Sequence, residues 1–132
     1  MIISFARIEA LDRGGGVTTL PLVTPGSRPG APITTGISIY PAATGAPLHT
    51  HNCDEQVTLI GGLAEVEIAG VVSPLEPHDT TYIPQGTEHA FRNRGTEPMT
   101  ILWIYCSDRV TRTLSASGET VEHLSERDVM VK

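Results

Sequence analysis

The sequence predicts an all-β protein, a sandwich or a barrel, and three observations support this. Glycine and proline, 13 and 10 of the 132 residues, interrupt the chain at short and even intervals. The segments between them are rich in valine, isoleucine, threonine and tyrosine, the residues that strands favour. No internal segment combines helical periodicity with a length of about ten residues or more. Many short strands separated by frequent turns are typical of sandwiches and barrels.

Eight segments are predicted to be strands. In chain order they are IISFARI (2–8), VTTLPLV (17–23), TTGISIY (34–40), EQVTLIG (55–61), AEVEIAG (64–70), TTYIP (80–84), AFRN (90–93) and MTILWIY (99–105). The best helix candidate is ETVEHLSERDVM (119–130), for which an irregular tail is the alternative. Two loops, PGSRPGAP (25–32) and PAATGAP (41–47), are too rich in proline and glycine to be strands. Loops at a barrel mouth commonly shape a ligand site.

Alternation along the strands predicts which residues face the core. In 55–61, Glu55 lies on the same face as two apolar residues, and in 64–70 the acids point outward. The segment 100–106 differs, because it is apolar on both faces. A strand buried on both sides belongs to a sheet that is covered on its back as well as its front. We therefore expect a second subunit on that face, and thus a homodimer.

Composition excludes several functional classes. The formal charge of −6 and the scattered arginines argue against nucleic-acid binding, which usually requires a basic patch. No apolar run approaches the roughly eighteen residues of a membrane span. The segment 1–13 lacks the features of a signal peptide. We therefore expect a cytoplasmic protein in which Cys53 and Cys106 are reduced.

The segment PLHTHNCDEQ (47–56) carries the first half of a candidate site. Histidines two apart on an extended segment project to the same side, so His49 and His51 can present two imidazoles to one point. Such a pair is also common at surfaces, and Glu55 alone could equally be a solvated acid.

The second half lies in YIPQGTEHAFRN (82–93), where His89 shares a strand face with Phe91 and Asn93. If this face is interior, the polar imidazole needs a partner, and a metal ion is one such partner. Three neutral imidazoles and a carboxylate suit a first-row divalent ion and leave coordination positions for water or substrate.

The two segments together resemble the motifs of the cupin family. The family's first motif, with His-x-His followed by glutamate, corresponds to GAPLHTHNCDEQVTLIGG (45–62). The second, with Pro-x-Gly followed by histidine and asparagine, corresponds to HDTTYIPQGTEHAFRN (78–93). The resemblance covers about residues 34–106. It departs from the family pattern at Gly45, which lies closer to the histidines than usual, and at His78, where glycine is common.

The resemblance implies a single cupin domain over 1–132. Its fold would be a jelly-roll barrel, also called a double-stranded β-helix, with the N-terminal strand segment and the C-terminal tail outside the motifs. The metal ligands that it implies are His49, His51, Glu55 and His89. Glu55 uses the shorter of the two spacings found in the family, and Asp54 and Gln56 are the alternatives if that spacing turns the carboxylate away.

The implied function is that of a metal-dependent enzyme. Cupins with such sites use iron, manganese, nickel, copper or zinc for oxygenation, decarboxylation or isomerisation of small organic molecules. The alternative is a cupin that binds a metal or small ligand without turning it over. A purely structural metal and a sugar-nucleotide epimerase are weaker alternatives. No inward-facing general acid or base is evident, since Glu88 faces away from His89, and this favours metal-centred chemistry such as that of a dioxygenase.

The remaining candidates are aromatic and polar residues near the predicted ligands. Those expected to line a substrate pocket are Tyr40, Phe91, Asn93 and Trp103, with core packing as the alternative for the aromatic residues. Cys53 is expected to be a small residue in a turn, or else a switchable ligand or redox-sensitive thiol. His78 and His123 are expected at the surface.

Overall fold

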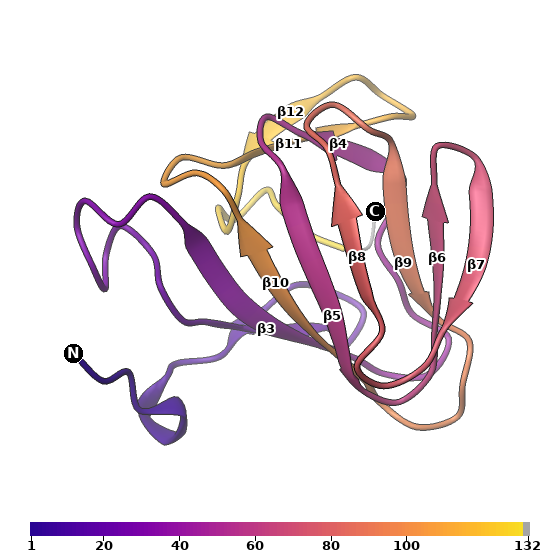
Figure 1. Ribbon diagram of the computed structural model, residues 1–132, viewed down its shortest axis with the longest axis horizontal. Helices are drawn as coiled ribbons and strands as arrows, with labels where there is room; N and C mark the ends of the chain where they lie inside the picture. Colours follow the sequence, from indigo (N-terminus) through magenta and orange to yellow (C-terminus); the bar gives the residue numbers. More distant parts are fainter. Residues whose placement is uncertain (131–132) are drawn as a thin grey trace.

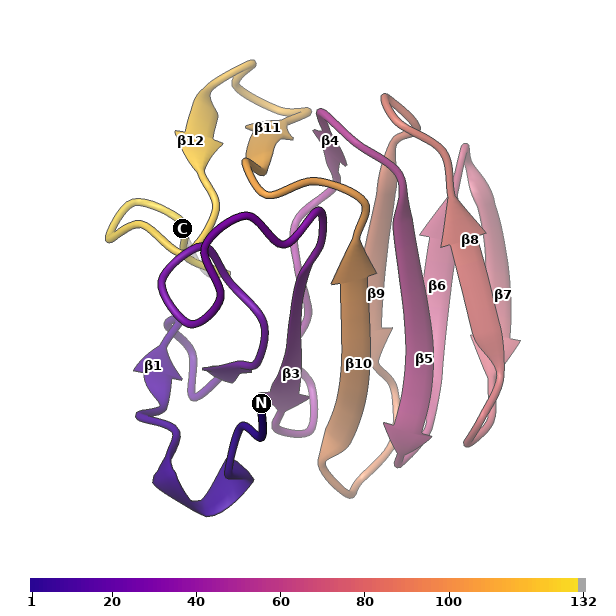
Figure 2. The same cartoon turned by 60° about the vertical axis from the view of Figure 1, so that its left-hand side comes forward.

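The computed structural model describes residues 1–130, in which two six-stranded antiparallel sheets face each other (Figures 1 and 2). The strand order is β1-β2-β3-β10-β5-β8 in the first sheet and β12-β11-β4-β9-β6-β7 in the second. The only helical element in this part of the chain is a 3-10 turn, η1 (Phe5–Arg7). The predicted all-β fold is confirmed, and the arrangement is that of a jelly-roll barrel.

The twelve strands of residues 1–130 are short, two to seven residues each. The first sheet contains β1 (Leu11–Asp12), β2 (Thr18–Pro21), β3 (Thr34–Tyr40), β10 (Met99–Tyr105), β5 (Glu55–Gly61) and β8 (Thr80–Ile83). The second contains β12 (Thr120–Glu122), β11 (Thr111–Leu114), β4 (His49–His51), β9 (His89–Asn93), β6 (Ala64–Ile68) and β7 (Val71–Leu75).

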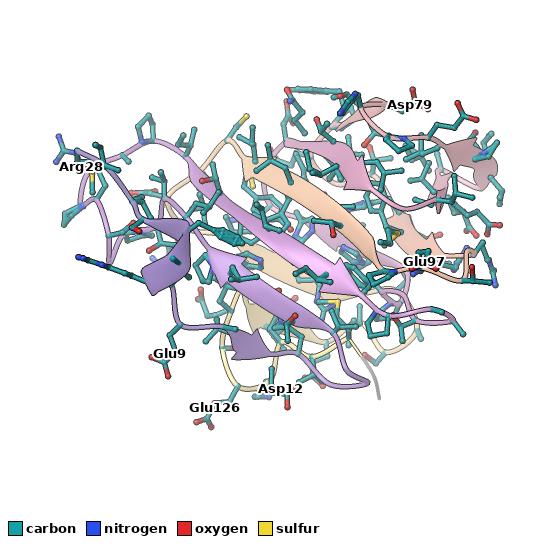
Figure 3. All side chains as sticks on the ribbon, turned by 90° about the horizontal axis from the view of Figure 1, so that it is seen from below. Glu9, Asp12, Arg28, Asp79, Glu97 and Glu126 are labelled. Carbon is teal, nitrogen blue, oxygen red and sulfur yellow. The ribbon has the colours of Figure 1, made fainter. Side chains whose placement is uncertain are left out.

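The core lies between the two sheets, where alternate residues of each strand meet. In β5, Val57 and Leu59 are 1% and 0% exposed, whereas Ile60 on the other face is 43% exposed. Burying each such aliphatic side chain stabilises the fold by about 1.5–3 kcal/mol. Charged side chains that face outward, such as Glu9 and Glu126, project into solvent (Figure 3). The predicted alternation is therefore present.

The pairing of the second sheet places its polar residues on the inner face. Strand β4 lies between β9 and β11, so that His49 is directly opposite His89 and His51 is directly opposite Arg112. Directly opposed residues of antiparallel strands point to the same face. The register therefore brings three histidines and an arginine together inside the barrel.

Two terminal segments differ from the prediction. Residues 2–8 form no strand; they contain η1 instead, they pair with no strand of either sheet, and Ile2 is 94% exposed. Of the two alternatives for 119–130, the helix is wrong, since Thr120–Glu122 pairs with β11, whereas the turns after it agree with an irregular tail. In that segment strand pairing and the burial of Val121 outweigh the weak helical pattern.

Five strands in the described part of the chain lie outside the eight predicted segments: β1, β4, β7, β11 and β12. Strand β7 contains Pro74, which interrupts the strand pattern in the sequence. Strand β7 lies at the edge of its sheet. Proline is tolerated in an edge strand, because the backbone N–H that it lacks can be one that would face away from the sheet.

Strand β10 is buried on one face only in this single chain. Its inward residues include Trp103, 3% exposed, while Leu102 and Ile104 on the outer face are half-buried. The homodimer that this apolar outer face suggests stays a prediction. Among residues 1–130, no helix is both long and apolar enough to span a membrane.

Candidate metal centre

Three buried imidazoles converge in the interior of the barrel. The side chains of His49, His51 and His89 each place one ring nitrogen within 4.8 Å of the others, and no residue of the three is more than 6% exposed. Their ring centroids lie 4.4 to 5.3 Å apart. These distances allow one metal ion to contact all three nitrogens.

Backbone carbonyls fix the orientation of each ring. The Nδ1 atoms of His49, His51 and His89 lie 2.6, 2.9 and 2.8 Å from the carbonyl oxygens of Pro47, Thr111 and Thr87. A carbonyl can only accept, so each Nδ1 must donate its proton. In the neutral rings every Nε2 is then an acceptor, the state that binds a metal.

Glu55 reaches the same point from the opposite sheet. Its Oε1 atom lies 3.0 Å from Nε2 of His89 and 3.9 Å from Nε2 of His51. Since the His89 ring donates through Nδ1, a hydrogen bond from Nε2 to Glu55 needs a second proton on the ring; without it, Nε2 and the Glu55 oxygen are both acceptors. Two acceptors at this distance require a shared cation, either a proton or a metal ion. The donor set therefore fits a divalent metal.

Burial controls the protonation of the site. It lowers the pKa of His49 well below the usual value, helped by repulsion from the other two imidazoles, and it lowers that of His51 as well. Burial alone would raise the pKa of Glu55, but the hydrogen bond with His89 and the charges of both nearby rings outweigh it and lower the pKa. At neutral pH, the neutral His49 and His51 imidazoles therefore face the Glu55 carboxylate, and these are the deprotonated donors that a metal binds.

A phenol completes the donor cluster. Tyr105 lies directly opposite Glu55 in the pairing of β10 with β5, and its hydroxyl is 3.2 Å from Nε2 of His51. Burial raises its pKa well above the usual value, and the neighbouring Glu55 carboxylate raises it further. Tyr105 therefore stays protonated, and both Nε2 of His51 and the Glu55 carboxylate lie beside its hydroxyl as acceptors.

These residues surround a small cavity of about 40 Å³. Its walls are formed by Arg13, Ser38, Tyr40, Ala46, His49, His51, Glu55, His89, Phe91, Ile101, Trp103, Tyr105, Arg112, His123, Asp128 and Met130. Of the two loops expected to shape a site, 41–47 contributes Ala46, and 25–32 contributes none of these residues. The cavity is thus closed in part by the C-terminal segment, through Asp128 and Met130.

Most predicted pocket residues lie on the cavity wall. Tyr40, Phe91 and Trp103 line it, and the Trp103 indole nitrogen donates to Ser38 at 2.9 Å. Asn93 is not among the lining residues. Its amide donates to the carbonyl oxygens of Tyr40 and Glu97, and its carbonyl oxygen accepts the Gly95 N–H, so that it holds a turn together.

The two residues before Glu55, Asp54 and Cys53, do not join the histidine cluster. Asp54 is directed away from the histidines, where it accepts hydrogen bonds from the Tyr82 hydroxyl and the backbone N–H of Gln85. Cys53 is 8% exposed and packs in the apolar core. Burial raises its pKa to about 11, so the thiol stays protonated.

Sequence reasoning missed four cavity residues, Arg13, Arg112, His123 and Asp128. The expectation of a surface position holds for His78, which is exposed, but is wrong for His123. The His123 ring packs against Trp103 and Tyr105, with centroid distances of 5.0 and 4.9 Å. Strand β12 carries it inward, and a three-residue strand gives too short a pattern to detect.

Comparison with known proteins places the chain in a family. The model of the cupin domain family matches residues 36–105, more than half of the chain. The chain belongs to the cupin family. A search among curated proteins found no match to this cupin.

Solved structures support the same assignment. A cupin-2 domain from Rhodospirillum rubrum superposes with a TM-score of 0.76 at 18% identity, covering 89% of this chain and 81% of that one. A cupin 2 domain-containing protein from Halorhodospira halophila has a TM-score of 0.66 at 26% identity, covering 74% and 69%. A predicted oxalate decarboxylase from Thermotoga maritima has a TM-score of 0.70 at 16% identity, covering 81% and 99%.

Proposed function

We propose that this cupin is a metal-dependent enzyme that acts on a small organic substrate, as an oxygenase or a related decarboxylase or isomerase. Its metal ligands are His49, His51, Glu55 and His89. The observation that carries the proposal is the convergence of three buried imidazoles, whose Nδ1 atoms all donate to carbonyls, with the Glu55 carboxylate, whose Oε1 lies 3.0 Å from Nε2 of His89. A divalent ion resolves this contact.

Each part of the protein has a distinct role in this proposal. The three histidines and Glu55 would hold the ion, which would supply Lewis acidity toward substrate oxygens and, with iron or copper, the capacity for dioxygen chemistry. The carbonyls behind the histidines hold the rings in the binding orientation. Tyr105 keeps its proton, and because Nε2 of His51 has one lone pair, the Glu55 carboxylate would be the acceptor of the Tyr105 hydroxyl when an ion is bound. Phe91, Ile101 and Trp103 supply apolar walls that exclude water from the reacting groups.

The reaction class is the open part of the proposal. The predicted oxalate decarboxylase of Thermotoga maritima is similar to this chain at 16% identity, a level that concerns the fold. Decarboxylation is therefore one activity to assay beside oxygenation. His123 adds a neutral imidazole on the cavity wall, whose pKa burial lowers to about 3, and it is available to accept a hydrogen bond from substrate.

A second candidate function is that of a binding protein without turnover. The small cavity favours it, because about 40 Å³ is far below the roughly 300–1,000 Å³ of ordinary small-molecule pockets. A cupin that holds only the ion, as a sensor or store, needs no more room. The enzyme needs the wall to move.

Turnover by the metal-loaded protein separates the two candidates. Protein reconstituted with iron, copper, manganese, nickel or zinc is screened for oxygen uptake with catechols, enols and keto acids, and for carbon dioxide release from small acids. The His51→Ala/His89→Ala variant, reconstituted in parallel, is the matched control. Turnover that is lost in the variant supports the enzyme. Stoichiometric metal without turnover of any compound supports the binding protein.

We also propose that the protein is a cytoplasmic homodimer that pairs through the outer face of β10. The half-buried Leu102 and Ile104 support the interface, and the free thiols of Cys53 and Cys106 suit a reducing compartment. Sedimentation analysis should give twice the mass of the chain for wild type and a monomer for Leu102→Glu. A wild-type monomer at micromolar concentration contradicts the dimer.

A further inference from the structure

Two arginine side chains are buried inside the barrel, beside the candidate metal ligands. Arg13 and Arg112 are 4% and 1% exposed, and both line the same cavity as the histidines. Arg112 faces inward because it is directly opposite His51 in the pairing of β11 with β4. Arginine is seldom buried so completely without an anionic partner.

One carboxylate serves both guanidinium groups. Asp128 is 1% exposed; its Oδ2 lies 2.8 Å from an Nη atom of Arg13, and its Oδ1 lies 2.8 Å from Nε of Arg112. Two positive charges thus share one negative charge. Glu55 adds a second carboxylate to the cavity, but it is engaged with the imidazoles. The arginine end of the cavity therefore has an excess of positive charge.

The contact with Arg112 is close but poorly directed. Although Nε of Arg112 and Oδ1 of Asp128 are 2.8 Å apart, neither makes a well-aligned hydrogen bond with any described residue. The other donors of Arg112 reach the Val129 carbonyl oxygen at 2.7 Å and the Met130 sulfur at 3.7 Å. A thioether is a weak acceptor, whereas a free carboxylate can bind a guanidinium through two parallel hydrogen bonds.

All of these acceptors belong to one short segment, which lies outside the regular sheets. After β12 the chain forms turns beside β1, on the side of the molecule that carries the first strands (Figure 2). The Met130 N–H donates to the Arg13 carbonyl oxygen at 2.7 Å, and the Tyr40 hydroxyl lies 3.5 Å from the Met130 sulfur. Residues 124–130 thus close the cavity with few regular backbone hydrogen bonds. The segment is held chiefly by contacts with the two arginines, so it can open without breaking either sheet.

We propose that Arg13 and Arg112 form a carboxylate-binding site and that Asp128 occupies it in this structure. A ligand carboxylate binds by displacing Asp128 together with residues 124–130, which also enlarges the small cavity next to the histidines. If the protein is the proposed enzyme, its substrate is a carboxylic acid, and this part of the proposal rests on the proposed function. Carboxylate binding itself requires only the two arginines.

Malonate and its uncharged analogue malonamide test this proposal in the full chain, with and without metal. Trp103 is the only tryptophan and lines the cavity, so its fluorescence reports binding. Trypsin cleavage after the exposed Arg127 reports release of the segment, measured as the peptide from Asp128 onward. We expect malonate, but not malonamide, to give a saturable fluorescence change and to speed this cleavage at least fivefold.

Variants separate displacement of Asp128 from general loosening. Asp128→Asn should bind malonate at least fivefold more tightly and should be cleaved faster without it, because the competing charge is gone. The double variant Arg112→Gln/Asp128→Asn, which leaves no unpaired buried carboxylate, should keep its circular dichroism spectrum and lose the malonate response. The exposed Arg94 provides the control Arg94→Gln, which should behave as wild type.

The outcomes are distinguishable from those of the metal proposal. Malonate binding by metal-free protein, with the variant pattern above, supports the carboxylate site even if no metal binds. The absence of a saturable response in both wild type and Asp128→Asn overturns it, whatever the metal content. An equal response to malonamide, or a full response in the double variant, overturns it as well.

Discussion

The substitution Asp128→Asn tests the energetic role of the buried arginine pair. Asparagine has nearly the same shape as aspartate but no charge, and its NH₂ group must replace one of the two oxygens that face Arg13 and Arg112. One guanidinium then faces a donor instead of an acceptor, and both lose their counter-charge. Removing one partner from a buried ion pair costs about 3–5 kcal/mol, because an uncompensated charge stays buried.

For a domain of this size, each 1 kcal/mol lowers Tm by roughly 4 °C, so the expected decrease is about 12–20 °C. Differential scanning calorimetry and urea unfolding of metal-free protein measure both quantities, with the exposed residue variant Glu126→Gln as control. Saturating malonate should recover part of the loss, since a ligand bound only by the folded state stabilises it. A loss below about 1 kcal/mol would refute the reasoning, because it would mean that water already compensates the guanidinium charges.

Three further predictions concern the cavity and its surroundings. Burial lowers the pKa of His123 to about 3, and the charged or titratable groups around its ring are Asp128, Arg13, His51 and Arg112. Because the imidazole takes up a proton near pH 6.5 only in the unfolded chain, the free energy of unfolding should fall by up to about 2 kcal/mol from pH 7 to pH 5. Urea titrations of the His123→Gln variant should show a flatter dependence on pH. The substitution Gly36→Ala places a Cβ against the Trp103 ring, where there is no room for it, and should destabilise the protein by about 1–3 kcal/mol with a shifted Trp103 emission. A wild-type emission spectrum would contradict the close contact. Glu55→Gln should lower metal affinity at least tenfold in a metal titration, whereas Asp54→Asn should leave it unchanged. Equal losses of affinity in the two variants would show that Glu55 is wrongly assigned as the carboxylate ligand.

Local spacing is sufficient to predict the histidine part of the site. His49 and His51 lie two apart on an extended segment, so their spacing predicts a common face, and His89 shares a face with Phe91 and Asn93 after a Pro-x-Gly turn. Their meeting point depends on the pairing of His49 with His89, which the barrel topology provides. The family motifs carry that topology, and the chain's membership of the family is confirmed.

Long-range charge pairing could not be predicted in the same way. Arg13 and Asp128 are separated by 115 residues, and no local pattern marks either as buried. In sequence, Arg13 precedes a run of glycines and Asp128 lies among charged residues, both typical of exposed turns. Their burial results from the C-terminal turns that fold back beside β1. The same turns explain why a helix over 119–130 does not form.

Strand prediction failed where the pattern was short or interrupted. Strands β4 and β12 have three residues each, too few for alternation to be distinctive. In β7, proline interrupts an otherwise suitable segment. Residues 2–8 have the right composition but pair with no strand of either sheet, which composition does not reveal.

Metal stoichiometry tests the central claim most directly. Protein produced without a chelating tag is analysed by elemental mass spectrometry as purified and after reconstitution, beside the His51→Ala/His89→Ala variant. The account predicts close to one first-row divalent ion per chain in wild type and almost none in the variant. A wild-type protein that binds no metal even after reconstitution, or a variant that keeps its metal, would contradict the assignment of these residues as a metal centre.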